Sequence, residues 1–290
     1  MKIASYYLDG HERTGIVRGD SVVDVSDLMP GAPSSTRQLL CLMDETPGLS
    51  GTLVRRAEEC AGVVLSDVRL LPVITRPHAV WCAALTYLSH VREGGDRPAP
   101  DYPLFFLRVA DSQMGHGAPM IAPVVSQQLD YEGELAVVIG RRGRHIREAD
   151  ALAHVAGYSC YNDGSVRDWQ RHTSQITVGK NFAATGGFGP WLVTSDEIGD
   201  PYDRGLQTRL NGEVVQSAKI SELLFSIEYM IAYLSTACTL EVGDVIVTGT
   251  CGGVGVRRNP PLFLQPGDVV EVEIDGIGTL LNPVEAEAAA

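Results

Sequence analysis

Two glutamates stand directly before a continuous apolar run, and this arrangement restricts the fold more than any other feature of the chain. Glu132 and Glu134 precede the run at 135–139, which reads Leu-Ala-Val-Val-Ile. Residues two apart on a strand project from the same face, so both carboxylates would point one way. An uninterrupted apolar run is typical of a strand that is covered on both faces. The sequence therefore predicts two carboxylates at the start of a buried strand.

Buried carboxylates that lie side by side need a counter-charge, because repulsion and lost hydration destabilise them. A divalent cation, completed by a third carboxylate, is the simplest partner, and Asp163 is the candidate for that ligand. The motif holds no His or Cys, and an all-oxygen ligand set favours Mg²⁺ or Mn²⁺, with Ca²⁺ as a further choice, over zinc. The alternative is a solvated strand edge, with Asp163 only capping a turn.

Further motifs follow in order along the chain, and each is more specific than Glu-x-Glu alone. They are Gly-Tyr-Ser-Cys-Tyr-Asn-Asp-Gly-Ser-Val-Arg-Asp at 157–168, Gly-Lys-Asn-Phe at 179–182, Gly-Pro-Trp-Leu-Val-Thr at 189–194, Leu-Asn-Gly-Glu-Val-Val-Gln at 210–216 and Gly-Asp-Val-Ile-Val-Thr-Gly-Thr at 243–250. In order and spacing the chain resembles the fumarylacetoacetate hydrolase family from about residue 75 to 284. The resemblance implies an α+β, mostly β fold, a mixed β-sandwich or roll with few helices, and a homodimer.

The resemblance also assigns roles to four residues after the first two glutamates. It makes Asp163 a metal ligand together with Glu132 and Glu134. It makes Arg167 and Gln170 substrate-binding and Lys180 catalytic, as donors aimed at developing negative charge. For Arg167 the sequence leaves open a local ion pair with Asp168, and Asp168 itself is expected to be structural.

A second catalytic group lies earlier in the chain. His90 and Glu93 are three residues apart, so on a helix they share a face, and the carboxylate would orient the imidazole as a general base. The segment resembles the family's His-x-x-Glu dyad, which sits on a mobile lid, and Tyr87 is expected to bind substrate. The Gly- and Pro-rich stretch 93–100 fits a loop that orders on substrate binding. Many relatives have Asn where this chain has Thr86, which affects the lid's packing.

Three positions near the expected pocket have open interpretations. The resemblance gives Thr250 a role in binding the substrate's carboxylate, and Cys251 replaces the usual Pro. The sequence gives little support to a cysteine nucleophile at this position. Arg108 and Gln113 are expected either to line the pocket or to be structural.

Composition excludes several classes of partner. The net charge of −13 disfavours nucleic acid and anionic membranes. The N-terminus lacks the apolar stretch of a signal peptide, and no window is long and apolar enough to cross a bilayer. Six scattered cysteines without a Cys-x-x-Cys pair predict reduced thiols, with neither disulfides nor zinc. We therefore expect a cytoplasmic protein.

The chain is predicted to consist of a small N-terminal β-rich domain (1–70), a catalytic domain (71–285) that resembles the family, and a tail (286–290), with Leu70-Leu71-Pro72-Val73 at the entry into the main domain. The first domain is predicted to hold a short β-meander and a helical stretch at 36–61, broken at Pro47-Gly48. The second is predicted to be strand-rich, with a hairpin at Asp275-Gly276 and a helix that begins near Ser226.

The sequence predicts a divalent-metal-dependent hydrolase that cleaves a carbon–carbon bond in a small β-diketo acid of the acylpyruvate type, in aromatic catabolism. The alternative is a decarboxylase, isomerase or dehydratase that acts on an oxo-diacid or a hydroxymuconate-like acid. All of these reactions pass through an enolate, so the motifs do not choose between them. A third interpretation is a metal-dependent protein that binds keto acids without turnover.

Overall fold

Strand β11 (Gly133–Ile139) lies inside a mixed sheet and is buried along its whole length. It pairs antiparallel with β12 (Val155–Asp163) on one side and with β17 (Val245–Val247) on the other. Its side chains alternate between two apolar cores: Leu135, Val137 and Ile139 enter one, and Ala136 and Val138 enter the other. The prediction of a strand covered on both faces is therefore confirmed.

The computed structural model describes residues 1–95 and 98–288, and over these residues the main sheet has twelve strands. Ten follow the order β4-β3-β2-β1-β14-β12-β11-β17-β6-β7, while β5 pairs with β1 and β8 with β14. The strands not yet given bounds are β1 (Lys2–Leu8), β2 (His11–Arg18), β3 (Ser21–Asp24), β4 (Val63–Val64), β5 (Arg69–Leu70), β6 (Val80–Ala84), β7 (Leu104–Arg108), β8 (Gln113–Met114) and β14 (Gly186–Thr194).

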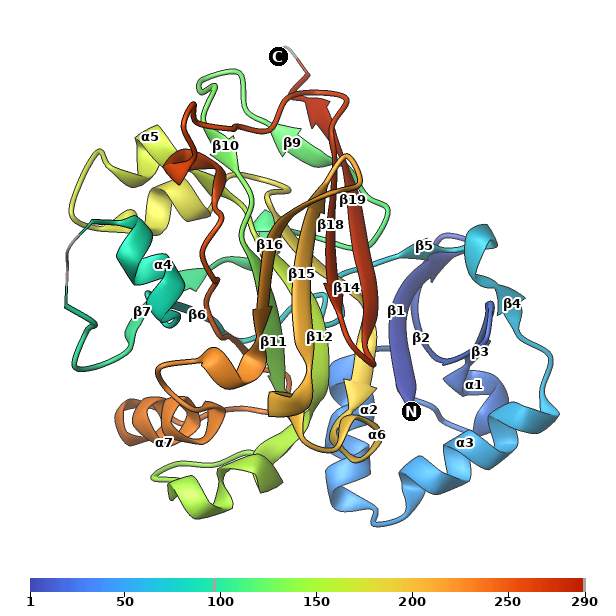
Figure 1. Ribbon diagram of the computed structural model, residues 1–290. Helices are drawn as coiled ribbons and strands as arrows, with labels where there is room; N and C mark the ends of the chain where they lie inside the picture. Colours follow the sequence, from blue (N-terminus) through green and yellow to red (C-terminus); the bar gives the residue numbers. More distant parts are fainter. Residues whose placement is uncertain (96–97, 289–290) are drawn as a thin grey trace.

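A second sheet packs on the main one and makes the sandwich (Figure 1). Its order is β16-β15-β18-β19-β9, and a separate short ladder joins β10 to β13. The strands are β9 (Met120–Ala122), β10 (Leu129–Asp130), β13 (Ser165–Val166), β15 (Gly205–Leu210), β16 (Glu213–Lys219), β18 (Val269–Ile274) and β19 (Gly278–Ala286). The hairpin predicted at Asp275-Gly276 joins β18 to β19, with Ile274 opposite Gly278. The expected mostly β, mixed-sandwich fold is confirmed.

Helices cover the faces that the two sheets leave open. The α-helices are α1 (Val25–Leu28), α2 (Thr36–Glu45), α3 (Leu49–Glu59), α4 (Leu88–Glu93), α5 (Arg167–Gln170), α6 (Ser195–Ile198) and α7 (Ile227–Ala237). Short 3₁₀ turns η1 to η7 span Leu65–Asp67, Ala110–Ser112, Glu148–His154, Ile176–Lys180, Pro201–Asp203, Ile220–Glu222 and Gly255–Arg257. Helix α7 begins as predicted, because the Ser226 hydroxyl accepts the N–H of Tyr229 at 3.0 Å. No described helix has the length and apolarity needed to cross a bilayer.

The N-terminal strands extend the main sheet. Strand β1 pairs antiparallel with β14, with Lys2 opposite Val193 and Ile3 opposite Leu192. Helices α2 and α3 then pack Leu39 and Leu53 into the same core as Ile3. The domain boundary near residue 70 stays a prediction, but the hydrogen-bonded sheet continues across it. Residues 289–290 of the predicted tail, and residues 96–97 of the predicted lid loop, lie outside the described residues.

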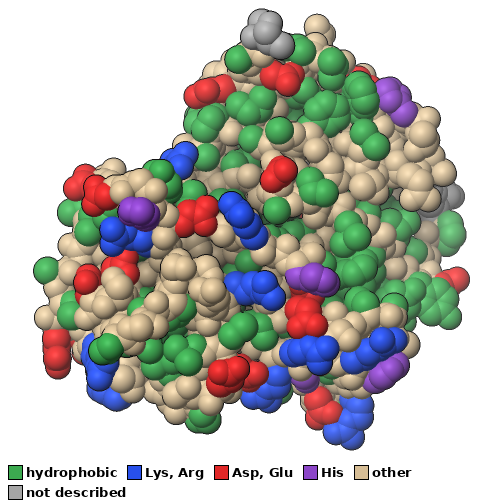
Figure 2. Space-filling model, turned by 180° about the vertical axis from the view of Figure 1, so that it is seen from behind, with side chains coloured by type: hydrophobic (Ala, Val, Ile, Leu, Met, Phe, Trp, Pro, Cys, Tyr) green, Lys and Arg blue, Asp and Glu red, His purple; other side chains and the backbone are tan. Residues whose placement is uncertain are grey.

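Charges are mixed on the molecular surface. Figure 2 shows acidic and basic side chains interspersed with apolar ones on the face opposite to that of Figure 1. A nucleic-acid-binding face gathers Lys and Arg instead. That polyanions are not partners stays a prediction, which rests on the net charge of −13.

Candidate active site

The pairing of β11 with β12 brings three carboxylates together. Asp163 ends β12, and its N–H donates to the carbonyl of Glu132, just before β11, at 2.8 Å. One ligand oxygen from each of Glu132, Glu134 and Asp163 lies within 4.8 Å of the others. All three side chains are buried. The solvated-edge alternative for this motif is therefore wrong.

Three buried cations surround the carboxylates. The Lys180 ammonium lies 2.6 Å from Glu132 Oε2 and 2.6 Å from Asp163 Oδ2. Arg167 Nη2 lies 2.7 Å from Glu132 Oε1, and Arg108 Nη1 lies 2.5 Å from Asp163 Oδ1. Glu132 and Asp163 are thus each held by two cations.

Glu134 is held differently from its neighbours. Burial alone would raise the pKa of Glu132, but the charges of Arg167 and Lys180 lower it to about 2. Burial and the charges of Asp163 and Glu132 raise the pKa of Glu134 well above its usual value. Glu134 accepts the N–H of Gly249 at 2.5 Å and forms no ion pair among the described residues. A position that buries an acid without a counter-charge fits a divalent cation with Glu132, Glu134 and Asp163 as its ligands.

Gly249 has to be a glycine for Glu134 to be held in this way. Its φ is +95°, and an added Cβ would lie 1.9 Å from Thr86 Oγ1. Thr86 is itself buried and donates to the carbonyl of Thr248 at 2.7 Å. Thr86, two residues before helix α4, therefore ties the start of this segment to the residue after β17.

We expect an Arg108→Met variant to be less stable than the wild type by about 3–5 kcal/mol, because it leaves Asp163 buried without one of its cations. Arg108 is 3% exposed, and it also donates to the Gly164 carbonyl and the Thr185 hydroxyl. The free energy of unfolding in urea measures the effect. The matched control is Arg142→Met, which breaks the exposed pair with Glu241 and should change stability by at most about 1 kcal/mol. Equal stabilities for the two variants would contradict the expectation.

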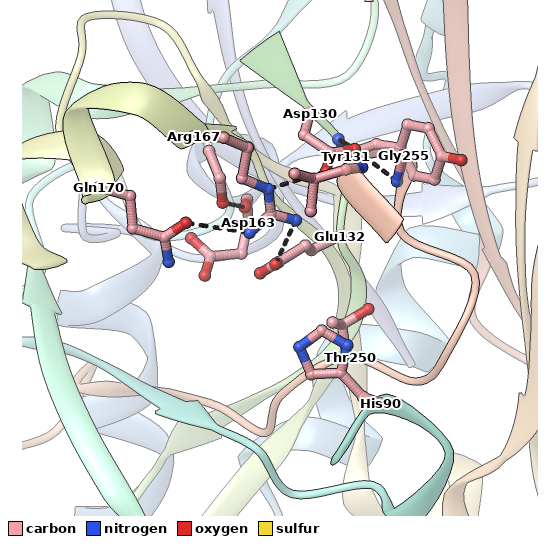
Figure 3. Close-up of polar contacts among 12 residues, drawn as sticks. His90, Asp130, Tyr131, Glu132, Asp163, Arg167, Gln170, Thr250 and Gly255 are labelled. Atoms are coloured by element: carbon pink, nitrogen blue, oxygen red, sulfur yellow. Dashed lines mark hydrogen bonds and ion pairs between the residues drawn. The ribbon is translucent and has the colours of Figure 1, made fainter. Parts of the chain in front are cut away.

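A cavity of about 300 Å³ opens over the carboxylates. Its charged lining comes from His90, Glu132, Glu134, Asp163, Arg167, Arg171, Lys180 and Arg257, and Gln170 and Thr250 also line it. Figure 3 shows His90 on one side of the open space and Glu132, Asp163 and Arg167 on the other. The structure thus brings most of the sequence-predicted site residues to one cavity.

Helix α4 carries the predicted dyad. His90 Nδ1 lies 3.1 Å from Glu93 Oε1, and Glu93 Oε2 accepts the N–H of Gly253 at 2.7 Å. The N–H of Gly252 donates to the Ser89 hydroxyl at 3.1 Å, so two bonds dock the helix on the loop after Thr250. With Nδ1 engaged by Glu93, Nε2 is the ring nitrogen left for a molecule in the cavity.

Of two further residues of the predicted site, Tyr87 is placed differently from the expectation, whereas Thr250 lines the cavity. Tyr87 does not line the cavity; it is 1% exposed and packs in the apolar core, so the structure gives no support to its predicted contact with substrate. The Thr250 hydroxyl donates to the Gly133 carbonyl at 3.0 Å and accepts from Gln216 Nε2 at 2.8 Å. Burial is the main cause that raises the pKa of the Cys251 thiol to about 12, which fits the expectation against a cysteine nucleophile.

Asp130 was not predicted from the sequence, and it holds Arg167. Its Oδ2 accepts Arg167 Nε at 2.8 Å, so the alternative of an ion pair with Asp168 is wrong. Asp168 instead accepts the Ser126 hydroxyl and the N–H of Trp169, in the structural role expected for it. The sequence around Asp130 gives no sign of this contact, because Arg167 lies 37 residues away and no local pattern links the two positions.

Arg108 and Gln113 were predicted either to line the pocket or to be structural, and the structure favours the structural role. Neither lines the cavity. Arg108 holds Asp163 from the far side, and Gln113 Oε1 accepts the Tyr161 hydroxyl at 2.5 Å. They support the carboxylate cluster from behind.

Comparison with known proteins shows the family of the chain. The family described as "Fumarylacetoacetate (FAA) hydrolase C-terminal" matches residues 79–285. This match covers more than half of the chain, and the chain belongs to the fumarylacetoacetate hydrolase family.

Particular relatives have different activities in their names. The chain is 40% identical over 270 residues to human "Oxaloacetate tautomerase FAHD2A, mitochondrial", covering 92% of this chain and 84% of that one. A maleylpyruvate hydrolase from Sphingobium sp. SYK-6, solved with manganese(II) and pyruvate, superposes with a TM-score of 0.82 at 26% identity, over 99% of this chain and all of that one. A 5-carboxymethyl-2-hydroxymuconate delta-isomerase from Mycobacterium smegmatis gives 0.78 at 29% identity, over the whole of both chains.

Proposed function

We propose that the protein is a divalent-metal-dependent enzyme that interconverts the keto and enol forms of a small 2-oxo acid. One observation carries the proposal: His90, held by Glu93, faces Glu132 and Asp163 across a single cavity (Figure 3), which Glu134 and Lys180 also line. An imidazole in this place can accept a proton from the carbon next to an oxo group. The 40% identity to an oxaloacetate tautomerase supports the same chemistry.

The chain's own residues supply the parts that a tautomerase needs. His90 takes one proton from carbon 3, and one proton returns to the oxygen of carbon 2, so the reaction needs no co-substrate. Lys180 and Arg167 place positive charge where the oxygen becomes negative. Burial would lower the pKa of Lys180, but Asp163 and Glu132 outweigh it and raise that pKa, so the ammonium stays charged. A divalent cation on Glu132, Glu134 and Asp163 supplies the Lewis acidity that polarises the oxo group.

Carbon–carbon hydrolysis of an acylpyruvate is the second candidate. Here His90 would take a proton from water, whose oxygen adds to the distal carbonyl. The carbon–carbon bond would then break to give a carboxylic acid and pyruvate. The His90–Glu93 dyad suits this step equally, because Glu93 orients the imidazole whether the proton comes from water or from carbon 3. The maleylpyruvate hydrolase among the similar structures supports this candidate.

Turnover of two substrates, oxaloacetate and acetylpyruvate, distinguishes the candidates. We expect the Mn²⁺-loaded protein to accelerate the loss of the enol absorbance of oxaloacetate, and EDTA to abolish this acceleration. Release of pyruvate from acetylpyruvate without any effect on the oxaloacetate enol would favour the hydrolase instead. Release of carbon dioxide from oxaloacetate identifies a decarboxylase, and activity that ignores EDTA would contradict metal dependence.

The oligomeric state, the location and the metabolic role of the protein are also proposals. The family resemblance supports a homodimer, and the cytoplasmic location expected from the sequence stays a proposal. A role in aromatic catabolism follows only if acylpyruvates are turned over. The human relative's name places that protein in mitochondria, which leaves the location of this chain as a prediction.

A further inference from the structure

Two arginines that line the cavity have no acidic partner in the part of the chain that the structure describes. Of the four cationic residues in the lining besides His90, Lys180 is paired with Glu132 and Asp163, and Arg167 is paired with Asp130 and Glu132. The other two are Arg171 and Arg257, and both are exposed. Within residues 1–95 and 98–288, neither guanidinium has a carboxylate within 4 Å or donates a hydrogen bond. No described acidic group neutralises their charge at the cavity.

Asp130 fixes both arginine-bearing segments relative to each other. Its Oδ2 accepts Arg167 Nε at 2.8 Å, at the start of helix α5, which is followed directly by Arg171. Its two oxygens also accept the N–H groups of Gly255 and Val256 at 2.8 and 2.9 Å, in the turn that ends with Arg257. One buried carboxylate therefore holds α5 and η7 at the same side of the cavity (Figure 3).

Arg257 also lies beside the helix that carries the dyad. A Cβ added at Gly94, which follows α4, would lie 3.7 Å from Arg257 Nη2. The Arg257 guanidinium thus lies near the end of the helix that carries His90, and Arg257 lines the cavity. The acids that line the cavity, Glu132, Glu134 and Asp163, are all buried at its floor. A second anionic group of a bound molecule would therefore meet cations at the wall.

We propose that Arg171 and Arg257 form a subsite for a second, distal carboxylate, so that the preferred substrates are 2-oxo-diacids. The inference rests on the proposed function and specifies its substrate class. The 2-oxo carboxylate end of the molecule lies at the carboxylate cluster, and the distal carboxylate reaches the two arginines. Guanidinium groups suit this task because they bind carboxylates through two N–H donors and stay charged.

The test compares two ligands of equal chain length that differ only at the far end. Binding of 2-oxoglutarate and of 2-oxopentanoate to the Mn²⁺-loaded protein is measured by titration calorimetry. We expect wild type to bind the diacid at least about tenfold more tightly, since charged hydrogen bonds of this kind are strong. Arg171→Met and Arg257→Met should each reduce this preference, and the double variant should remove it without changing the affinity for 2-oxopentanoate.

A matched double variant, Arg55→Met with Arg144→Met, removes two exposed arginines that do not line the cavity and should keep the preference. Arg257→Lys should keep part of it, because the charge remains. Equal binding of both ligands by wild type, a preference that persists in the double variant, or no binding of the diacid would each overturn the subsite.

Hydrogen exchange at carbon 3 of oxaloacetate in D₂O, measured in parallel, tests the proposed function separately. Loss of exchange with an intact diacid preference contradicts the tautomerase and supports the subsite. Exchange without a preference for the diacid supports the tautomerase and contradicts the subsite.

Discussion

A Glu134→Gln variant is expected to lose divalent-cation binding and to keep its fold. Glu134 is 1% exposed, and its Oε2 accepts the N–H of Gly249. Glutamine has the same shape and still offers an oxygen to Gly249, but it brings no negative charge. Because burial, Asp163 and Glu132 raise the pKa of Glu134, the metal-free protein already favours a neutral side chain there. The metal-free variant should therefore be at least as stable as the wild type at neutral pH.

The loss of cation binding should be large. Mutation of residues that only hydrogen-bond to a metal ligand weakens metal binding by about 10–100-fold. Removal of the charge of a ligand itself should therefore weaken Mn²⁺ binding by more than about 100-fold. Activity at a fixed metal concentration should fall by about 10³-fold, since the cation's polarising effect is worth several kcal/mol.

Mn²⁺ titration calorimetry and thermal unfolding with and without Mn²⁺ measure these effects. Mn²⁺ should raise the melting temperature of the wild type and leave that of Glu134→Gln unchanged. The control Glu148→Gln makes the same charge change at an exposed position and should behave as the wild type. Wild-type Mn²⁺ affinity in Glu134→Gln would refute the assigned ligand set.

A His90→Gln variant should lower kcat by about 10²–10⁴-fold and leave Mn²⁺ affinity within about twofold of the wild type, as removal of a general base does. His90 lines the cavity but forms no ion pair with the three carboxylates, which explains the expected separation of the two effects. Ligand affinity should also be kept. The measurement is kcat for the enol of oxaloacetate, together with calorimetry for Mn²⁺.

Variants at two other positions sharpen this prediction. Glu93→Gln keeps an oxygen for His90 and one for Gly253, so it should cost about tenfold in kcat, less than the loss of the imidazole. His11→Gln removes an exposed histidine from β2 and should change nothing. If His90→Gln turned over oxaloacetate like the wild type, His90 would not be the base. If the wild type bound 2-oxo acids tightly without turnover, the non-catalytic binding protein would be the better description.

Local spacing was enough to predict several parts of the site. The Glu-x-Glu pair before an apolar run predicted the buried strand β11 with both carboxylates on one face, because side-chain direction on a strand alternates with a period of two. The three-residue spacing of His90 and Glu93 predicted their contact, since helical geometry brings such positions together. These are short-range relations that the backbone imposes by itself.

Partners far apart in the chain were decided only by the tertiary structure. The antiparallel register of β11 with β12 sets Asp163 beside Glu132, but nothing in the spacing shows that Arg108 reaches Asp163 or that Asp130 reaches Arg167. The same holds for the continuation of the sheet through β1 and β14, and for the burial of Tyr87 away from the cavity. Sequence determined which side chains share a face of a strand or helix. Only the packing of whole strands against each other determined which buried charges meet, because each such contact closes a long loop that leaves no local pattern.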